Sequence, residues 1–156
     1  MLDPVIQGLL LNFTPYGFFL LLVGSFVGWV CGLIPGLSGS TAIILLLPLT
    51  FGMGLNGAMI LLIGAMGAST VGGSITAILL NVPGAAVNAA TCFDGFPMAR
   101  QGKAGVAISA AASASMFGGI FGAFVLIAFI PLINRLILAF GPPEFFAMCI
   151  WGLSVI

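Results

Sequence analysis

Charged residues are almost absent from this sequence of 156 residues. Only 4% of the residues are Asp, Glu, Lys or Arg, three of each sign, whereas 62% are hydrophobic. A soluble domain carries about 25% charged residues, and so few charges cannot cover a water-exposed surface without leaving large apolar patches. The composition therefore predicts an integral membrane protein in contact with the lipid bilayer.

Histidine is absent as well, and the basic residues are few. Without histidine, this chain cannot build a Ser–His catalytic pair or a histidine-ligated zinc or haem site. Three Lys and Arg side chains cannot neutralise enough phosphates to bind a nucleic acid. The sequence therefore indicates a protein that is neither an enzyme nor a nucleic-acid-binding protein.

Long apolar runs are what the sequence has in abundance. Four runs stand out, at Tyr16–Ile34, Ser38–Phe51, Ala58–Val82 and Ala104–Ile130. In lipid the backbone must satisfy its own hydrogen bonds, which predicts helices, and three of the runs approach or exceed the about 20 residues that cross a bilayer. The second run spans only about 21 Å as a helix. We therefore expect an all-α membrane protein, a polytopic helical bundle whose helices are broken or re-entrant at Pro-Gly sites.

The first Pro-Gly segment covers residues 32–41. Its candidate binding residues are Pro35, Gly36, Ser38, Gly39, Ser40 and Thr41. Proline and glycine interrupt a helix, so a half-helix should begin just after them. Its N-terminus would carry a partial positive charge and, with the hydroxyls, could hold a carboxylate without a buried cation.

The second such segment covers residues 72–84, and we expect the run to be broken at Gly72-Gly73. Its candidate binding residues are Ser74, Thr76, Asn81, Pro83 and Gly84. Hydroxyls and freed carbonyls there could bind a carboxylate or a sodium ion near Asn81. Gly/Pro-interrupted segments that occur as a pair are typical of transporter binding sites. The alternative is that both segments only kink their helices.

Three charged residues follow in a polar stretch at 83–103. Asp94 precedes Arg100 and Lys103, and Asp-Gly-Phe-Pro at 94–97 is typical of a tight turn. Asp94 is either a solvated loop acid that pairs with Arg100 or Lys103, or part of a gate whose ion pair differs between inward and outward states. Farther along, Gly118 and Gly122 have the GxxxG spacing, which predicts a helix packed against other helices.

These segments resemble a known family. The residues that carry the likeness are GGSITAILLNVPG at 72–84, DGFPMARQGKAG at 94–105 and GLIPGLSG at 32–39. They resemble the large membrane subunit of tripartite tricarboxylate transporters, the TctA family.

The resemblance implies a multi-pass permease of the bacterial inner membrane without a cofactor. It would act with a small membrane subunit and a periplasmic solute-binding protein, and it would import carboxylates such as citrate, coupled to a sodium ion or a proton. Because the sequence ends within a short apolar run at Phe145–Ile156, we expect residues 1–156 to be a truncated, N-terminal portion of such a permease. The alternative is a non-transporting membrane scaffold or assembly fragment.

Overall fold

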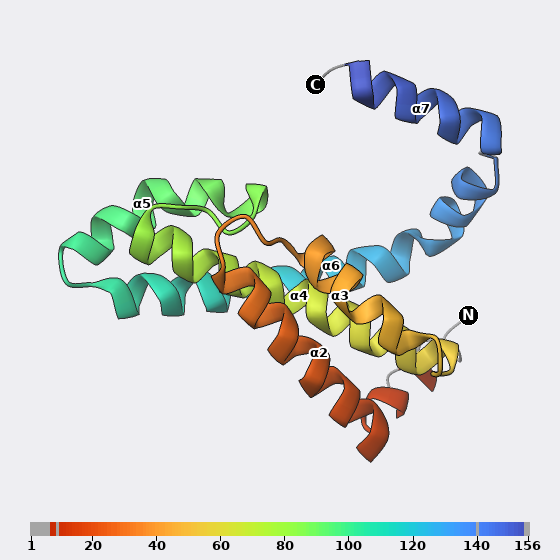
Figure 1. Cartoon of the computed structure of the whole chain (residues 1–156), viewed down its shortest axis with the longest axis horizontal. Helices are drawn as coiled ribbons and strands as arrows, with labels where there is room; N and C mark the ends of the chain where they lie inside the picture. The colour runs from red at the N-terminus through yellow and green to blue at the C-terminus, as the bar shows by residue number, and fades with distance from the viewer. Residues whose placement is uncertain (1–6, 9, 140, 155–156) are drawn as a thin grey trace. The chain divides into compact units, whose positions relative to one another are not determined.

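The computed structural model describes residues 7, 8, 10–139 and 141–154, with the side chains of residues 131, 132 and 134–139 outside this description. The described residues form helices joined by short connections and include no strand (Figure 1). Three helical stretches are long and apolar enough to cross a membrane: Pro15–Leu33, Leu55–Leu80 and Ala104–Ile130. The all-α membrane fold predicted from the sequence is thereby confirmed.

Helix α2 (Pro15–Leu33) begins at a well-formed cap. The Oγ1 atom of Thr14 accepts a hydrogen bond from the backbone N–H of Gly17 at 3.1 Å, and Pro15 occupies the first helical turn. A threonine cap followed by proline is a common helix start, because proline lacks an N–H group that would need an acceptor there. The predicted first run and the observed helix agree to within one residue at each end.

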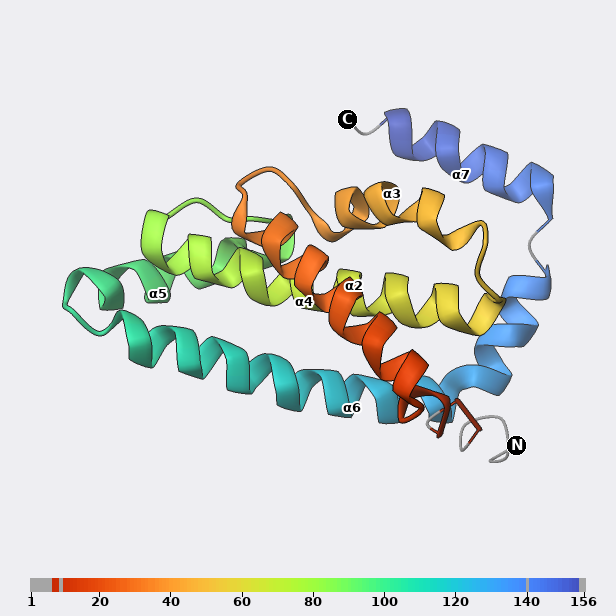
Figure 2. The same cartoon turned by 60° about the horizontal axis from the view of Figure 1, so that its bottom comes forward.

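Contacts between residues divide the chain into two units, Met1–Ser115 and Met116–Ile156. In the first unit, helix α4 (Leu55–Leu80) is central: α2, α3 (Gly39–Thr50), the short 3-10 helix η1 (Ala86–Asn88) and α5 (Ala89–Arg100) all pack against it. Figure 2 shows α2 crossing α4, with α3 beside both. The second and third predicted runs correspond to α3 and α4.

Small residues allow α2 and α4 to approach closely. A Cβ atom placed on Gly24, Gly28 or Gly32 would overlap the backbone carbonyl oxygen of Leu61, Ala65 or Ser69, respectively. Each of the three glycines is buried. Glycines four residues apart form one face of a helix, and in a membrane such a face permits close backbone packing. The core beside this contact contains Leu20, Cys31, Ala42, Leu46, Leu61 and Ala65.

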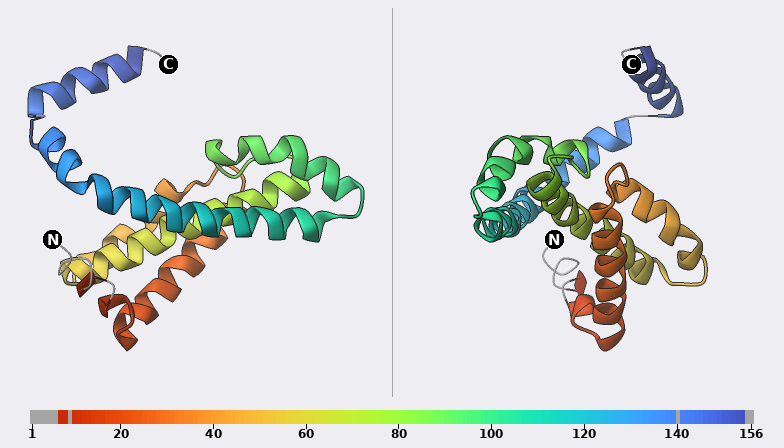
Figure 3. Two further views of the ribbon diagram at one scale, coloured as in Figure 1. Left: turned by 180° about the vertical axis from the view of Figure 1, so that it is seen from behind. Right: turned by 60° about the vertical axis from the view of Figure 1, so that its left-hand side comes forward.

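Helix α6 (Ala104–Ala139) starts in the first unit and continues into the second, which also contains α7 (Pro142–Ser154). Figure 3 shows α5 turning back into the first part of α6 through residues 101–103. In the second unit, a Cβ atom placed on Gly118 or Gly122 would meet no other atom within 4 Å. The helix packing proposed for this GxxxG stripe therefore stays a prediction.

Candidate functional site

The first Pro-Gly segment separates two helices, as the sequence predicted. Helix α2 ends at Leu33, and the chain turns through Pro35 and Gly36 before α3 begins at Gly39. Gly36 has φ 87°, in the left-handed region that glycine adopts without steric cost. The backbone N–H of Leu37 donates to the carbonyl oxygen of Ile34 at 3.0 Å, which closes the turn.

The N-terminus of α3 carries hydroxyls but no side-chain cap. Ser38 occupies the N-cap position and its side chain makes no capping hydrogen bond. Instead, the Oγ atoms of Ser38 and Ser40 share a hydrogen bond of 2.5 Å. Ser40 is exposed and Thr41 is half-buried. The first N–H groups of a helix have no acceptor within the helix, so this end of α3 presents backbone donors and hydroxyls together, as expected for an anion site.

The second Pro-Gly segment lies at the end of α4, and the break expected at Gly72-Gly73 is wrong. Helix α4 runs without interruption from Leu55 to Leu80. It ends at Asn81, which has the left-handed conformation with φ 56° and ψ 28°. Asparagine tolerates this conformation better than most residues, and a left-handed residue after the last turn is a common way to end a helix. The structure thus gives Asn81 a role in terminating α4.

Gly72 and Gly73 serve close packing. A Cβ atom placed on Gly72 would lie 2.5 Å from the carbonyl oxygen of Trp29, and one on Gly73 would lie 2.8 Å from Nδ2 of Asn88. Both glycines are buried in the middle of a helix. Glycine in a membrane helix therefore marks either a break or a close approach, and here it marks the approach.

The two Pro-Gly segments meet on α4. A Cβ atom placed on Gly84 would lie 2.5 Å from Cα of Gly73 and 2.6 Å from the carbonyl oxygen of Gly32. The N–H of Gly84 also donates to the carbonyl oxygen of Gly73 at 3.4 Å. We call the four residues Gly32, Gly72, Gly73 and Gly84 the glycine junction.

The start of α3 lies close to this junction. A Cβ atom placed on Gly39 would lie 2.5 Å from Oγ of Ser69, and Ser69 also touches Gly32 of the glycine junction. Ser69 is buried, and its hydroxyl donates to the carbonyl oxygen of Met66 at 2.8 Å. The end of α2, the start of α3 and the segment after α4 therefore gather on residues 69–73 of α4.

The remaining polar residues of the second segment bond to backbone. Thr76 is buried, and its hydroxyl donates to the carbonyl oxygen of Gly73 at 3.0 Å. The hydroxyl of Ser74 donates to the carbonyl oxygen of Thr70 at 3.1 Å. Such bonds to the preceding helical turn are common for Ser and Thr in membrane helices. Thr76 is consequently a packing residue in this structure, whereas Ser74 has a second partner.

That partner is Asn88, which the sequence analysis did not single out. Asn88 is 3% exposed, and its Nδ2 group donates to the carbonyl oxygen of Thr70 at 2.7 Å and to Oγ of Ser74 at 3.0 Å. These bonds fasten the start of α5 to the middle of α4. The signal available in the sequence was a lone asparagine in a short apolar stretch soon after Pro83-Gly84, since a buried amide needs partners.

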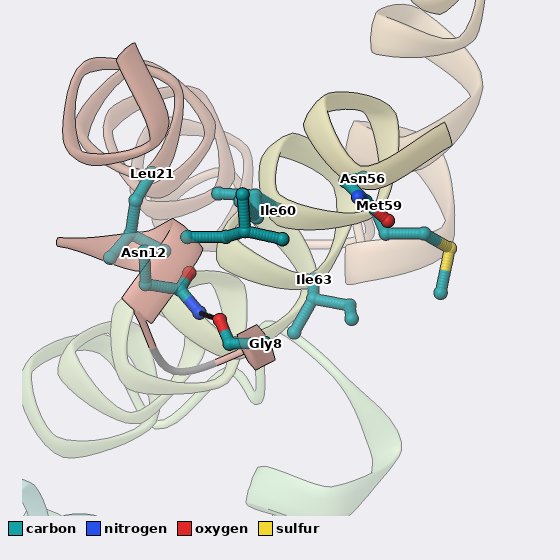
Figure 4. Close-up of a pocket in the computed structure, with 8 residues that line it drawn as sticks. Gly8, Asn12, Leu21, Asn56, Met59, Ile60 and Ile63 are labelled. Carbon is teal, nitrogen blue, oxygen red and sulfur yellow. Dashed lines mark hydrogen bonds between the residues drawn. The ribbon is translucent and has the colours of Figure 1, made fainter. Parts of the chain in front are cut away.

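A cleft of about 500 Å³ opens beside Asn88. Its wall is rich in hydroxyl side chains, and the residues that line it are Thr70, Ser74, Val87, Asn88, Thr91, Ala111, Ala114 and Ser115. A second cleft, near the N-terminus of α2, is mostly apolar (Figure 4). There Asn12 donates to the carbonyl oxygen of Gly8 at 2.8 Å, so its amide is engaged locally.

The candidate gating residues lie on and after α5. Residues 94–97 are inside this helix, so the predicted tight turn at Asp94 is wrong. Gly95 packs on α4, where a Cβ atom placed on it would lie 2.7 Å from Cγ1 of Ile78. This contact holds the segment helical against α4 in spite of Pro97.

No ion pair joins Asp94 to Arg100 or Lys103 in the described part of the chain, and all three residues are exposed. The guanidinium of Arg100 instead lies over the ring of Phe96, with 5.9 Å between its carbon and the ring centroid. Residues six apart lie on different sides of a helix, whereas facing pairs are three or four apart. While α5 is intact, Asp94 therefore does not face Arg100.

Fold and site together define a polytopic helical membrane protein in which two Pro-Gly segments converge on one central helix, and paired Gly/Pro segments are typical of membrane transporters. The comparison with known families gives the particular one. Residues 18–156 match the family described as "Tripartite tricarboxylate transporter TctA family". The chain belongs to this family, and membership in a transporter family indicates a non-enzymatic role.

A curated relative is 39% identical over 142 residues, which cover 91% of this chain. It is named "Uncharacterized 52.8 kDa protein in TAR-I ttuC' 3'region" and comes from Agrobacterium vitis. The chain spans 28% of the length of this relative. No solved structure matches the chain.

Proposed function

We propose that this chain is part of the membrane permease of an ion-gradient-driven uptake system for carboxylates, of which citrate is the type we expect. The family describes a tripartite system, and we infer that the permease works in the bacterial inner membrane with a small membrane subunit and a periplasmic solute-binding protein. The observation that carries the proposal is the meeting of both Pro-Gly segments at the glycine junction. Kinks that served only assembly would have no need to converge.

Uncharged dipoles are proposed to bind the carboxylate. The uncapped N-terminus of α3, with Ser38, Ser40 and Thr41, offers backbone N–H groups and hydroxyls at the start of a short apolar helix. A helix N-terminus acts as about half a positive charge and favours anions. This end of the helix is shaped by Pro35, Gly36 and Gly39. The segment that contains Pro83 and Gly84 completes the adjacent glycine junction.

Transport further requires that access to the site alternates between the two sides of the membrane. We propose that α5 and its connection to α6 take part in this gating, with Asp94, Arg100 and Lys103 at the exposed surface. Because Asp94 does not face Arg100 along α5, its partner in another conformational state would come from another segment. A sodium ion or a proton is the expected coupling ion.

The test is carboxylate uptake by the complete permease, co-expressed with its partner subunits. The double variant Ser38→Ala with Ser40→Ala should raise the KM for labelled citrate about thirtyfold, because two lost hydrogen bonds at about 1 kcal/mol each sum to about 2 kcal/mol. The single variant Ser40→Thr keeps the hydroxyl at this position and should retain most of the wild-type affinity for citrate. Ser109→Ala is the matched control, since Ser109 is exposed on α6 and bonds to its own helix.

The abundance and thermal midpoint of each variant in membranes would show that it folds. A folded double variant with an unchanged KM would contradict the assignment of the carboxylate to the start of α3. Complete permease that binds its partner subunits and takes up no carboxylate would favour the scaffold alternative.

A further inference from the structure

The cleft beside Asn88 has a chemistry that differs from that at the start of α3. All its lining residues fall within the first unit, Met1–Ser115. Five of them carry a hydroxyl or an amide, and none carries an ionisable group. An uncharged wall rich in oxygen atoms therefore lines this cleft.

The amide of Asn88 has a fixed orientation. Its nitrogen donates to the carbonyl oxygen of Thr70, which can only accept, so the amide cannot be flipped without losing this bond. In the described residues Oδ1 of Asn88 accepts no hydrogen bond. Every side-chain polar atom there that is fully shielded from solvent has a hydrogen-bond partner, so Oδ1 is not fully shielded. A 3% exposed side chain that lines the cleft thus turns an unpartnered carbonyl oxygen towards it.

Further oxygens are available around this one. The hydroxyls of Thr91 and Ser115 form no hydrogen bond within the part of the chain that the structure describes. The hydroxyls of Thr70 and Ser74 donate their protons to the carbonyl oxygens of Gly67 and Thr70, respectively. Oγ of Ser74 also accepts from Nδ2 of Asn88, so it keeps one lone pair for a ligand and Oγ1 of Thr70 keeps two. Donors are scarce by comparison.

The backbone supplies few donors at this point, although α5 begins here. The N–H of Asn88 donates to the carbonyl oxygen of Ala85 at 2.9 Å, and the N–H of Ala89 donates to that of Ala86. Two N–H groups of the helix start beside the cleft are therefore used within it, as the N–H groups of Thr41 and Ala42 are at the start of α3. A carboxylate would be repelled by Oδ1 of Asn88, and no cationic side chain lines the cleft to offset that repulsion.

We infer that this cleft binds a monovalent metal cation, with sodium as the fitting case, through Oδ1 of Asn88 and the hydroxyl oxygens of Thr70, Ser74, Thr91 and Ser115. Hard cations take oxygen ligands, and an uncharged ligand set suits a single positive charge because no carboxylate is present to offset a second one. No lining side chain could carry a coupling proton, since none of them titrates near neutral pH.

The inference rests on the proposed function, to which it adds the identity and place of the coupling ion. It also moves the sodium site from Asn81, where the sequence suggested it, to Asn88. Bound cation would tie η1 and α5 to α4 beside Gly73 of the glycine junction. Occupancy of this cleft would thus stabilise the segment that contains Pro83 and Gly84, next to the start of α3.

The experiment measures the thermal midpoint of the complete, detergent-purified permease without carboxylate. Sodium chloride is titrated against choline chloride at constant ionic strength. Wild type should be stabilised by sodium in a saturable way. Thr91→Val removes one ligand oxygen and no hydrogen bond, and it should raise the half-saturating sodium concentration at least about tenfold. Thr50→Val, whose hydroxyl bonds to Leu47 away from the cleft, should leave it unchanged.

Ser115→Ala gives a second, milder variant on α6 in case Thr91→Val folds poorly, and Ser109→Ala is its control. Stabilisation by sodium no greater than by choline would overturn the inference, as would an unchanged half-saturating concentration in both cleft variants. So would a cleft variant that changed only the affinity for citrate at saturating sodium, because the cleft would then bind the substrate. Failure of the proposed function is seen separately, as absence of citrate uptake in a permease that still binds sodium.

Discussion

Gly84 packs against the carbonyl oxygen of Gly32, although one follows α4 and the other lies in the last turn of α2. A Cβ atom on Gly84 would lie 2.6 Å from that oxygen. The contact joins the two Pro-Gly segments into one structural unit on α4. A change at either segment should therefore be felt by the other, and the start of α3, which rests on Ser69, lies close enough to be affected.

The first prediction concerns this contact. Gly84→Ala would place a methyl group on Cα of Gly73 and on the carbonyl oxygen of Gly32, both backbone atoms that cannot rotate away. We expect a loss of about 2 kcal/mol of stability and slower citrate uptake, measured by thermal unfolding and transport assays of the complete permease. Gly67→Ala is the control, because a Cβ atom there meets nothing within 4 Å. Equal effects of the two changes would mean that the contact is not formed in the membrane.

The second prediction concerns the face of α2 that carries Gly24, Gly28 and Gly32. A methyl group on Gly28 would overlap the carbonyl oxygen of Ala65 and push α2 away from α4. Gly28→Ala should therefore lower stability by about 3 kcal/mol, seen as less folded permease in membranes and a lower thermal midpoint. The control is Gly67→Ala on α4, which should leave the amount of folded permease and its thermal midpoint unchanged or slightly raised.

The positions of the helices could be predicted from the sequence because lipid leaves the backbone no other partner than itself. The predicted first and second runs end within one residue of α2 and α3. Pro35-Gly36 was also a reliable signal, since proline removes a donor and disfavours helix at the residue before it. These features depend on local chemistry, which the sequence displays directly.

The roles of individual glycines could not be predicted in this way. Gly72 and Gly73 resemble a break, yet they lie inside a continuous helix that other backbones approach. The spacing of Gly118 and Gly122 predicted a packing face on α6. The same spacing at Gly24, Gly28 and Gly32 forms the contact between α2 and α4. Whether a small residue faces a neighbour depends on contacts distant in sequence, and periodicity alone does not reveal them.

Tertiary contacts also determine the helical conformation of α5 and the role of Asn88. Asp-Gly-Phe-Pro favours a turn locally, but Gly95 packs on the fully buried Ile78 and the segment is helical. Asn88 gains its importance from Thr70 and Ser74, which lie far from it in the sequence. The candidate hydroxyls at the start of α3 could be found from the sequence, whereas the cleft beside Asn88 required the fold.

The third prediction separates a helix-ending role of Asn81 from a ligand role. Asn81→Gly fits the left-handed conformation at φ 56° and should leave the KM for citrate and the sodium dependence unchanged. Asn81→Ala should cost about 1 kcal/mol, because a Cβ-bearing residue without a polar side chain is disfavoured there. Thermal midpoints and uptake measured on both variants distinguish the roles. A raised KM in Asn81→Gly would restore the amide as a ligand.

The fourth prediction concerns Asp94 and Arg100, which share α5 without facing each other. Because no ion pair joins them in the described residues, a double-mutant cycle with Asp94→Asn and Arg100→Gln should give stability changes that add to within about 0.5 kcal/mol. Both positions are exposed, so each single change should alter stability by no more than about 0.5 kcal/mol. Uptake rates provide the second readout, since a gate that used either charge would slow transport in that variant without lowering its thermal midpoint. A larger coupling in the stability measurement would show that the two side chains do pair, and that α5 bends or unwinds between them in the folded protein.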